Sequence, residues 1–326
     1  MTAELLTDVS AAAAILRRGG LVAFATETVY GLGGNALDPA AVVKIFEAKQ
    51  RPQFDPLIVH LADRDQLPEV ASSVPEKAAK LMDHFWPGPL TFILPKQPFV
   101  PDLVTSGLPT VAVRVPGHPL ARDLIRAAGV PLAAPSANLF GRISPTTAQH
   151  VLDQLGDHID AVLDGGPCAV GIESTVIHCD PDGDVWLLRP GGITVEDIES
   201  VIGPLSGRAP TVLDQRTPQV SPGLLAQHYA PQKPLHILSE EEQPPASPHN
   251  GFLSLLPIES PEQFGRVEVL SQTGSLPEAA AGFFAALRRL DESDVVEIYA
   301  YRFPDRGLGR ALNDRLQRAA GSSRDH

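Results

Sequence analysis

The sequence predicts an α/β protein with a twisted mixed sheet, flanking helices and a second, smaller α/β unit. Over the first two-thirds of the 326 residues, short apolar runs alternate with segments of helical periodicity, which is typical of helices packed on a sheet. Several connections between these runs are too short for a parallel crossover, so we expect strands of both directions. A Pro-rich stretch then interrupts the pattern, which resumes beyond it.

The elements of the large unit follow from its apolar runs and their punctuation by Pro and Gly. The predicted strands are Leu21–Phe24, Leu57–His60, Leu90–Leu94, Val111–Val115, Leu132–Ala134, Ser174–His178 and Val185–Arg189. The predicted helices are Ala3–Arg18, Ala40–Lys49, Pro75–Phe85, Pro119–Ala128, Thr147–Leu155 and Val195–Ile202. The Thr- and Gly-rich run after Phe24 is interpreted as a polar turn.

Six prolines from Pro204 to Pro234 predict a stiffened linker, which we place at 206–234 between a domain spanning 1–205 and one spanning 235–326. The second domain has predicted strands at Leu235–Leu238, Phe252–Leu256, Arg266–Leu270 and Val295–Ala300, and predicted helices at Ala279–Leu290 and Gly309–Ala320. The acidic, Pro-rich segment 240–251 is expected to be a mobile surface loop.

Charge and composition exclude several classes of protein. The net charge of −13 argues against RNA or DNA as the main ligand, because nucleic-acid binders usually carry a basic footprint. No apolar run is long enough to span a membrane, and the N-terminus lacks the pattern of a signal peptide. The cysteines, Cys168 and Cys179, lack metal-type spacing. We therefore expect a cytoplasmic protein.

Two pairs of polar residues are the most informative feature of the chain. Lys49 and Arg51 lie in KQRPQFDPLIVH, and Ser136 and Asn138 lie in APSANLFGRISP. Pro52 and Pro135 favour an extended backbone, which would point both members of each pair to one side. Two cations and two neutral hydrogen-bonding groups could then converge on a phosphorylated, base-bearing ligand. The alternative for the cations is a solvated helix end.

Four motifs occur in an order and spacing that resembles the threonylcarbamoyl-adenylate synthase family in its long, two-domain form. They are TETVYGLG at 26–33, KQRP with DPLIVH, PSAN, and GIESTVIH at 171–178, and the likeness resumes at SPGLLAQHYAP, 221–231. The resemblance implies a YrdC-like twisted mixed sheet with flanking helices, followed by a smaller Rossmann-like α/β domain. It also implies synthesis of threonylcarbamoyl-AMP and pyrophosphate from L-threonine, bicarbonate and ATP.

The resemblance assigns roles to individual residues. It implies threonine contacts from Thr28, His60, Arg114 and Ser174, and ATP contacts from Lys49, Arg51, Asp55, Thr110, Ser136, Asn138, Ser144, Arg189 and His228. Lys49 and Arg51 are the predicted catalytic residues, because the reaction depends on positioning and on neutralising phosphate charge. His228 and Tyr229 suggest that the linker folds over the site as a lid. Asp55 stands where the family often has Asn, and a carboxylate there would repel phosphates unless it binds a metal ion.

Mg²⁺ is expected with ATP, without a dedicated protein metal site. The resemblance implies that the product passes to a tRNA threonylcarbamoyl transferase, so stable binding of nucleic acid is not expected. Two alternatives remain open. A non-catalytic RNA-binding or ribosome-maturation module would need a basic stripe, and a carbamoyl transferase like the hydrogenase maturation factors would carry CxxC pairs, which this chain lacks.

Overall fold

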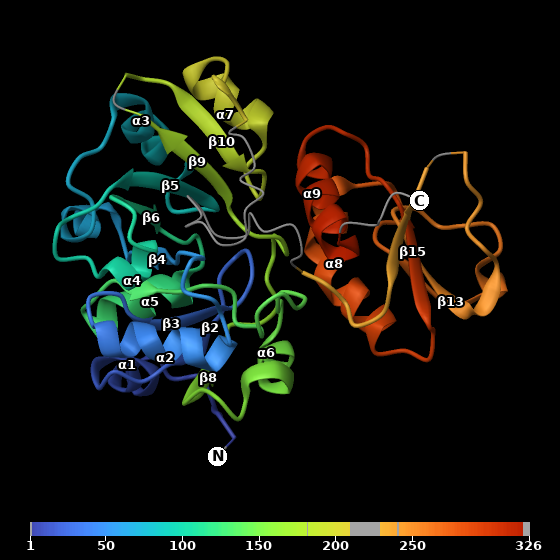
Figure 1. Ribbon diagram of the computed structural model, residues 1–326, viewed down its shortest axis with the longest axis horizontal. Coiled ribbons are helices and arrows are strands. Elements are labelled where there is room, and N and C mark those ends of the chain that lie inside the picture. The colour runs from blue at the N-terminus through green and yellow to red at the C-terminus, as the bar shows by residue number, and fades with distance from the viewer. Residues whose placement is uncertain (1, 181, 209–228, 240, 322–326) are drawn as a thin grey trace.

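The computed structural model describes residues 2–180, 182–208, 229–239 and 241–321. They form two lobes, each with its own sheet (Figure 1). The N-terminal lobe holds a mixed sheet and the C-terminal lobe a smaller parallel sheet, so the predicted fold class is confirmed. Among these residues, none of the helices combines the length and the apolar character needed to cross a bilayer.

The large sheet has the strand order β1-β8-β2-β3-β7-β4-β6-β5-β9-β10-β11. Its strands are β1 Glu4–Leu6, β2 Val22–Phe24, β3 Gly31–Asn35, β4 Ile58–His60, β5 Leu90–Pro95, β6 Thr110–Arg114, β7 Leu132–Ala133, β8 Ala161–Leu163, β9 Thr175–Cys179, β10 Val185–Arg189 and β11 Gly207–Arg208. Strands β4 and β6 are parallel, whereas β3 and β7 run antiparallel to their neighbours.

Helices cover the faces of this sheet (Figure 1). They are α1 Val9–Arg17, α2 Pro39–Lys49, η1 Arg64–Glu69, α3 Glu76–Phe85, α4 Asp102–Thr105, α5 Pro119–Ala128, α6 Ala148–Leu155 and α7 Val195–Ile202. Side-chain caps fix several of their starts. Asp38 accepts a hydrogen bond from the Ala40 amide at 2.9 Å before α2, and Thr194 forms a capping box with Asp197 before α7.

The C-terminal lobe has the strand order β12-β15-β13-β14, with every pairing parallel. Its elements are β12 Leu235–Leu238, β13 Ser247–Ser254, η2 Pro261–Gln263, β14 Phe264–Val269, α8 Leu276–Asp291, β15 Glu297–Tyr301 and α9 Leu308–Ala320. Helices α8 and α9 lie on the side of this lobe that faces the large one (Figure 1).

Three local predictions were wrong. The helix predicted over Ala3–Arg18 begins only at Val9, where Asp8 caps it, and the preceding Glu4–Leu6 forms β1 against β8. The glycine-rich run predicted as a turn contains β3, because glycine at Gly33 leaves room for the Phe24 ring, 2.8 Å from where a Cβ would stand. The loop predicted at 240–251 ends earlier, since β13 begins at Ser247.

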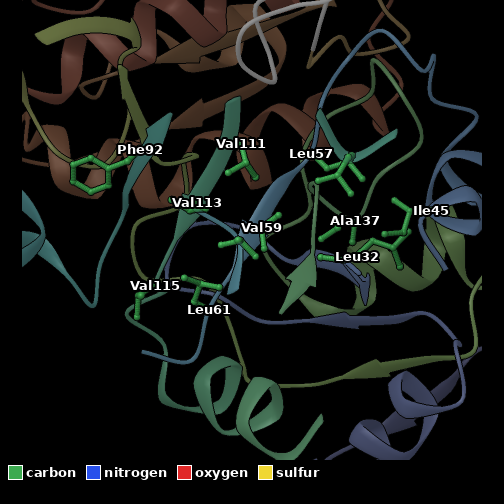
Figure 2. Close-up of a cluster of buried hydrophobic side chains, with 14 of the residues drawn as sticks. Leu32, Ile45, Leu57, Val59, Leu61, Phe92, Val111, Val113, Val115 and Ala137 are labelled. Carbon is green, nitrogen blue, oxygen red and sulfur yellow. The ribbon is translucent and has the colours of Figure 1, made fainter. Parts of the chain in front are cut away.

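Alternation along the central strands separates the core from the face that forms the site. Val59 of β4 and Val113 of β6 point into the main hydrophobic cluster, together with Phe92 of β5 (Figure 2). Their neighbours His60 and Arg114 therefore point to the opposite face. Burying the apolar residues fixes the register of the sheet, and the register decides which polar residues reach the site.

The two lobes share a hydrophobic cluster. Val29 and Ile172 of the N-terminal lobe pack with Phe283 and Phe284 of α8, and the cluster also contains Tyr229 from the end of the predicted linker. Most of that linker lies outside the described residues, including His228 and nearly all of SPGLLAQHYAP, and so does the predicted lid.

Candidate active site

A pocket opens on the face of the large sheet that carries His60 and Arg114. Its lining residues come from two parts of the N-terminal lobe, residues 26–60 and 114–189, and from Tyr229 at the end of the predicted linker. The lining residues are Thr26, Thr28, Val29, Gly31, Arg51, Ile58, His60, Arg114, Ala134, Pro135, Ser136, Glu173, Ser174, Arg189 and Tyr229.

Adjacent parallel strands bring His60 and Arg114 together. The two residues are register partners at the carboxyl ends of β4 and β6, and both are buried. Arg114 donates from Nε to the Gly88 carbonyl at 3.2 Å and from Nη1 to the Thr28 hydroxyl at 3.0 Å. These contacts hold the guanidinium at the edge of the pocket.

A carboxylate that the sequence analysis did not single out stands beside Arg114. Glu27 Oε1 lies 2.6 Å from Arg114 Nη2, and the Glu27 side chain is only 14% exposed. Burial alone would raise the pKa of Glu27, but the Arg114 guanidinium and hydrogen bonding outweigh it and lower that pKa. Glu27 is therefore ionised and balances the charge of Arg114.

His60 is neutral in this pocket. Burial, followed by the nearby Arg114 guanidinium, lowers the pKa of His60 to about 3. Its Nδ1 lies 3.2 Å from the Ile58 carbonyl, which can only accept, so Nδ1 carries the proton. Nε2 is consequently the acceptor of the ring.

The hydroxyls of the pocket are ordered by a short chain of hydrogen bonds. Thr26 donates to the Val29 carbonyl at 2.6 Å, so Thr28 must donate to Thr26, which lies 2.8 Å away. Across the pocket, the Ser174 hydroxyl lies 2.8 Å from Thr91, and Arg189 donates to the Ser174 carbonyl at 3.0 Å and hydroxyl at 3.2 Å. Thr28 and Ser174 thus have fixed orientations.

The extended backbone predicted for Lys49 and Arg51 was wrong. Helix α2 continues through Lys49 and ends because Gln50 adopts a left-handed conformation, with φ of 51°. The two side chains therefore diverge. Arg51 lines the pocket, whereas the fully buried Lys49 ammonium donates to the Ser136 carbonyl at 2.5 Å and to the Asn138 carbonyl.

Ser136 and Asn138 diverge in the same way. A tight turn joins them, with the Asn138 amide donating to the Ser136 carbonyl at 3.0 Å. Ser136 lines the pocket, while the Asn138 side chain donates to the carbonyls of Leu139 and Arg142. The structure brings the two polar pairs together, but in each pair one residue faces the pocket and the other holds the loop.

Asp55 pairs with Arg51. Its Oδ2 lies 2.9 Å from Arg51 Nη2, and both side chains are buried. Arg51 also donates to the carbonyls of Asp55 and Pro56, at 3.0 and 2.8 Å. Asp55 does not line the pocket, so its carboxylate stands behind the Arg51 guanidinium.

Glu173 is a second carboxylate that the sequence analysis did not single out. It lines the pocket, and its Oε1 accepts a hydrogen bond from the buried Ser144 hydroxyl at 2.6 Å. Its Oε2 accepts from Arg315 of α9 at 2.9 Å. Glu27 lies inside the motif TETVYGLG and Glu173 inside GIESTVIH. Their positions in these motifs were the signal from which the sequence could have identified them as site residues.

Thr110 stands apart from the other predicted residues. It shares a face of β6 with Arg114 but lies at the opposite end of the strand, where it lines a separate pocket with Pro95 and His178. No group of three or more His, Cys, Asp or Glu side chains suited to a metal ion occurs in the described part of the chain.

Comparisons with known proteins cover nearly the whole chain. A family model described as "Telomere recombination" matches residues 14–191, and one described as "Threonylcarbamoyl-AMP synthase, C-terminal domain" matches residues 193–321. Threonylcarbamoyl-AMP synthase of Bacillus subtilis (strain 168) is 47% identical over 98% of this chain and 96% of its own length. That of Pyrococcus abyssi is 41% identical over 95% and 93%. A crystal structure of P. abyssi Sua5 complexed with L-threonine has a TM-score of 0.87 at 38% identity, covering 98% of each chain.

Proposed function

Since this chain belongs to the threonylcarbamoyl-AMP synthase family, we propose that its pocket condenses L-threonine, bicarbonate and ATP into threonylcarbamoyl-AMP and pyrophosphate. The chain is an enzyme of the nucleotidyltransferase type. One observation carries the assignment of the reaction to this pocket: Arg114, Thr28 and His60 line the same pocket as Arg51 and Arg189. An amino acid and a nucleotide can therefore meet in it.

Arg114 supplies the carboxylate contact. A guanidinium has five N–H groups; one donates to Gly88 and one to Thr28, and Nη2 forms an ion pair with Glu27. N–H groups on Nη1 and Nη2 remain for the carboxylate of threonine. Nε2 of the neutral His60 accepts a hydrogen bond from the threonine hydroxyl or amine, and a protonated ring could not do so.

The reaction needs two bond-forming steps. The unprotonated amine of threonine attacks the carbon of bicarbonate, which loses water and gives a carbamate. A carbamate oxygen then attacks the α-phosphorus of ATP, the bond to the β-phosphate oxygen breaks, and pyrophosphate leaves. Arg51 and Arg189 stabilise the phosphate charge, and the fixed orientation of both substrates supplies much of the acceleration.

Mg²⁺ is proposed to enter with ATP. The carboxylates of Asp55 and Glu173 are paired with the guanidinium groups of Arg51 and Arg315, respectively. These pairings leave the described residues poorly suited to a protein-held ion, so the triphosphate is its main ligand.

The product is a mixed anhydride that water hydrolyses, which favours direct use by a second enzyme. We propose that a tRNA threonylcarbamoyl transferase takes it up and that this occurs in the cytoplasm, where ATP and tRNA are available. The chain's net charge of −13 supports release of the product without stable binding of tRNA.

The test is pyrophosphate release from ATP by the purified protein, with Mg²⁺ present and threonine and bicarbonate each added or omitted. Release that requires both substrates is expected. Absence of release from folded protein in every combination would refute the proposal. Release without threonine would indicate an ATP hydrolase.

A further inference from the structure

A charged side chain of the C-terminal lobe, Arg315, reaches the wall of the pocket. Arg315 lies on α9, yet it is completely buried against the N-terminal lobe. Its Nε donates to Glu173 Oε2 at 2.9 Å, and its Nη1 donates to the Pro190 carbonyl at 2.7 Å. Its guanidinium carbon also lies 5.5 Å from the centre of the Tyr229 ring, within range of a cation–π contact.

Each of these partners belongs to the pocket wall or adjoins it. Glu173 and Tyr229 line the pocket, and Pro190 directly follows Arg189, which also lines it. The segment after Pro190 is tightly packed on the wall, because a Cβ at Gly191 would lie 2.4 Å from the Glu173 carbonyl. A shift of Arg315 would therefore move several pocket residues together.

Glu173 is the central link of this arrangement. One carboxylate oxygen accepts from Arg315 and the other from Ser144, so the carboxylate joins α9 to the loop that carries Ser144. A buried carboxylate facing a triphosphate site would repel the substrate and would be costly to bury alone. Arg315 supplies the opposite charge and donates a hydrogen bond to one of the two carboxylate oxygens.

On the basis of the proposed function, we propose that Arg315 is a positioning residue for adenylate synthesis. Through Glu173 and Pro190 it fixes Ser144 and Arg189, and so the C-terminal lobe takes part in nucleotide binding instead of merely packing on the catalytic lobe. A residue that only anchored the two lobes would stabilise the protein without affecting substrate parameters. Arg310, also on α9, has that simpler geometry, since it pairs with Glu196 at 2.9 Å on the surface.

The experiment compares Arg315→Met with the control Arg310→Met in the full chain. For each variant, kcat and KM for ATP and threonine are measured together with Tm and the folded fraction. Loss of a hydrogen-bonded charged contact predicts a decrease of about tenfold to a hundredfold in kcat/KM for ATP for Arg315→Met, with the larger change in KM for ATP. Arg310→Met should stay within about twofold of the wild type, as exposed ion pairs contribute little.

Coupling to Glu173 is tested by a double-mutant cycle. If Arg315 acts through Glu173, the loss in Arg315→Met/Glu173→Gln should be close to that of the more impaired single variant. Should Arg315→Met fail to fold, Arg315→Lys with and without Glu173→Gln gives the same comparison. The proposal would be overturned if the two single losses in kcat/KM for ATP multiply in the double variant. A folded Arg315 variant with wild-type kinetics and only a lower Tm would overturn it as well. Inactive wild-type protein would instead refute the proposed function itself.

Discussion

Replacing Lys49 by Met should destabilise the loop that carries Ser136. The Lys49 ammonium donates to the carbonyls of Ser136 and Asn138, and the side chain is completely buried. Met keeps much of the aliphatic volume but has no donor. The Asn138 carbonyl would lose its Lys49 donor, and the Ser136 carbonyl would keep only the Asn138 amide. Burial and the neighbouring Arg51 guanidinium lower the pKa of Lys49, and the same burial keeps water from replacing the lost donor.

The magnitude follows mainly from the orphaned Asn138 carbonyl, because the Ser136 carbonyl keeps the Asn138 amide. Leaving a buried hydrogen-bonding group unsatisfied costs about 1–3 kcal/mol, so we expect a loss of about that size in unfolding free energy. That is a measurable part of the ~5–15 kcal/mol by which most domains are stable. Activity should fall as well, because Ser136 would no longer be held at the pocket.

Urea unfolding at pH 7.5 measures the free energy, and pyrophosphate release measures turnover. Lys44→Met is the matched control on the same helix, because the Lys44 ammonium donates to the Gly19 carbonyl at an exposed position where water can substitute. We expect a change below about 0.5 kcal/mol for this control. If Lys49→Met unfolds like the wild type while losing turnover, Lys49 acts on the phosphates directly and the reasoning fails.

Three further predictions concern the pocket. His60→Gln should flatten the dependence of the unfolding free energy on pH. The pKa of His60 is about 3 in the folded state and 6.5 in the unfolded state, so only the unfolded wild type takes up the proton and the wild type loses about 2 kcal/mol between pH 8 and pH 5. Equal losses for the wild type and the variant in urea titrations would contradict this. Arg114→Lys should raise KM for threonine about tenfold or more and change KM for ATP little. Lys cannot contact Gly88, Thr28, Glu27 and a carboxylate together. Equal changes in both KM values would count against Arg114 as the contact for the threonine carboxylate. Chelation of Mg²⁺ should stop turnover, whereas calorimetry without ATP should detect no stoichiometric Mg²⁺ binding; tight binding to the protein alone would reveal a metal site.

Local signals predicted many elements well. Helix α5 was predicted at Pro119–Ala128 and α7 at Val195–Ile202, and both have those limits. Pro at the start and Gly after the end define the first, and Thr194 defines the second. These signals operate within a few residues, so one sequence suffices to find them.

Long-range contacts explain what was missed. Strand β1 forms because β8, more than 150 residues away, offers a parallel partner, while Glu4–Leu6 alone fits the periodicity of α1. The divergence of Lys49 from Arg51 depends on the left-handed Gln50, which carries none of the usual glycine signal. The partners of Glu27 and Glu173 lie on distant elements, and a sequence shows a carboxylate without showing the cation that will bury with it.

Three charged groups that line the pocket, Arg51, Arg114 and Glu173, share an arrangement that follows from such contacts. Arg51 is backed by Asp55, Arg114 by Glu27, and Glu173 by Arg315. Unpaired, each buried charge would be costly, and before substrate binds the cations would also repel one another. Pairing weakens the attraction for phosphate and carboxylate but keeps each group oriented, so little reorganisation is needed when the substrates arrive. Asp55 illustrates the point: beside ATP a free carboxylate would be unfavourable, whereas behind Arg51 it fixes the guanidinium that faces the pocket.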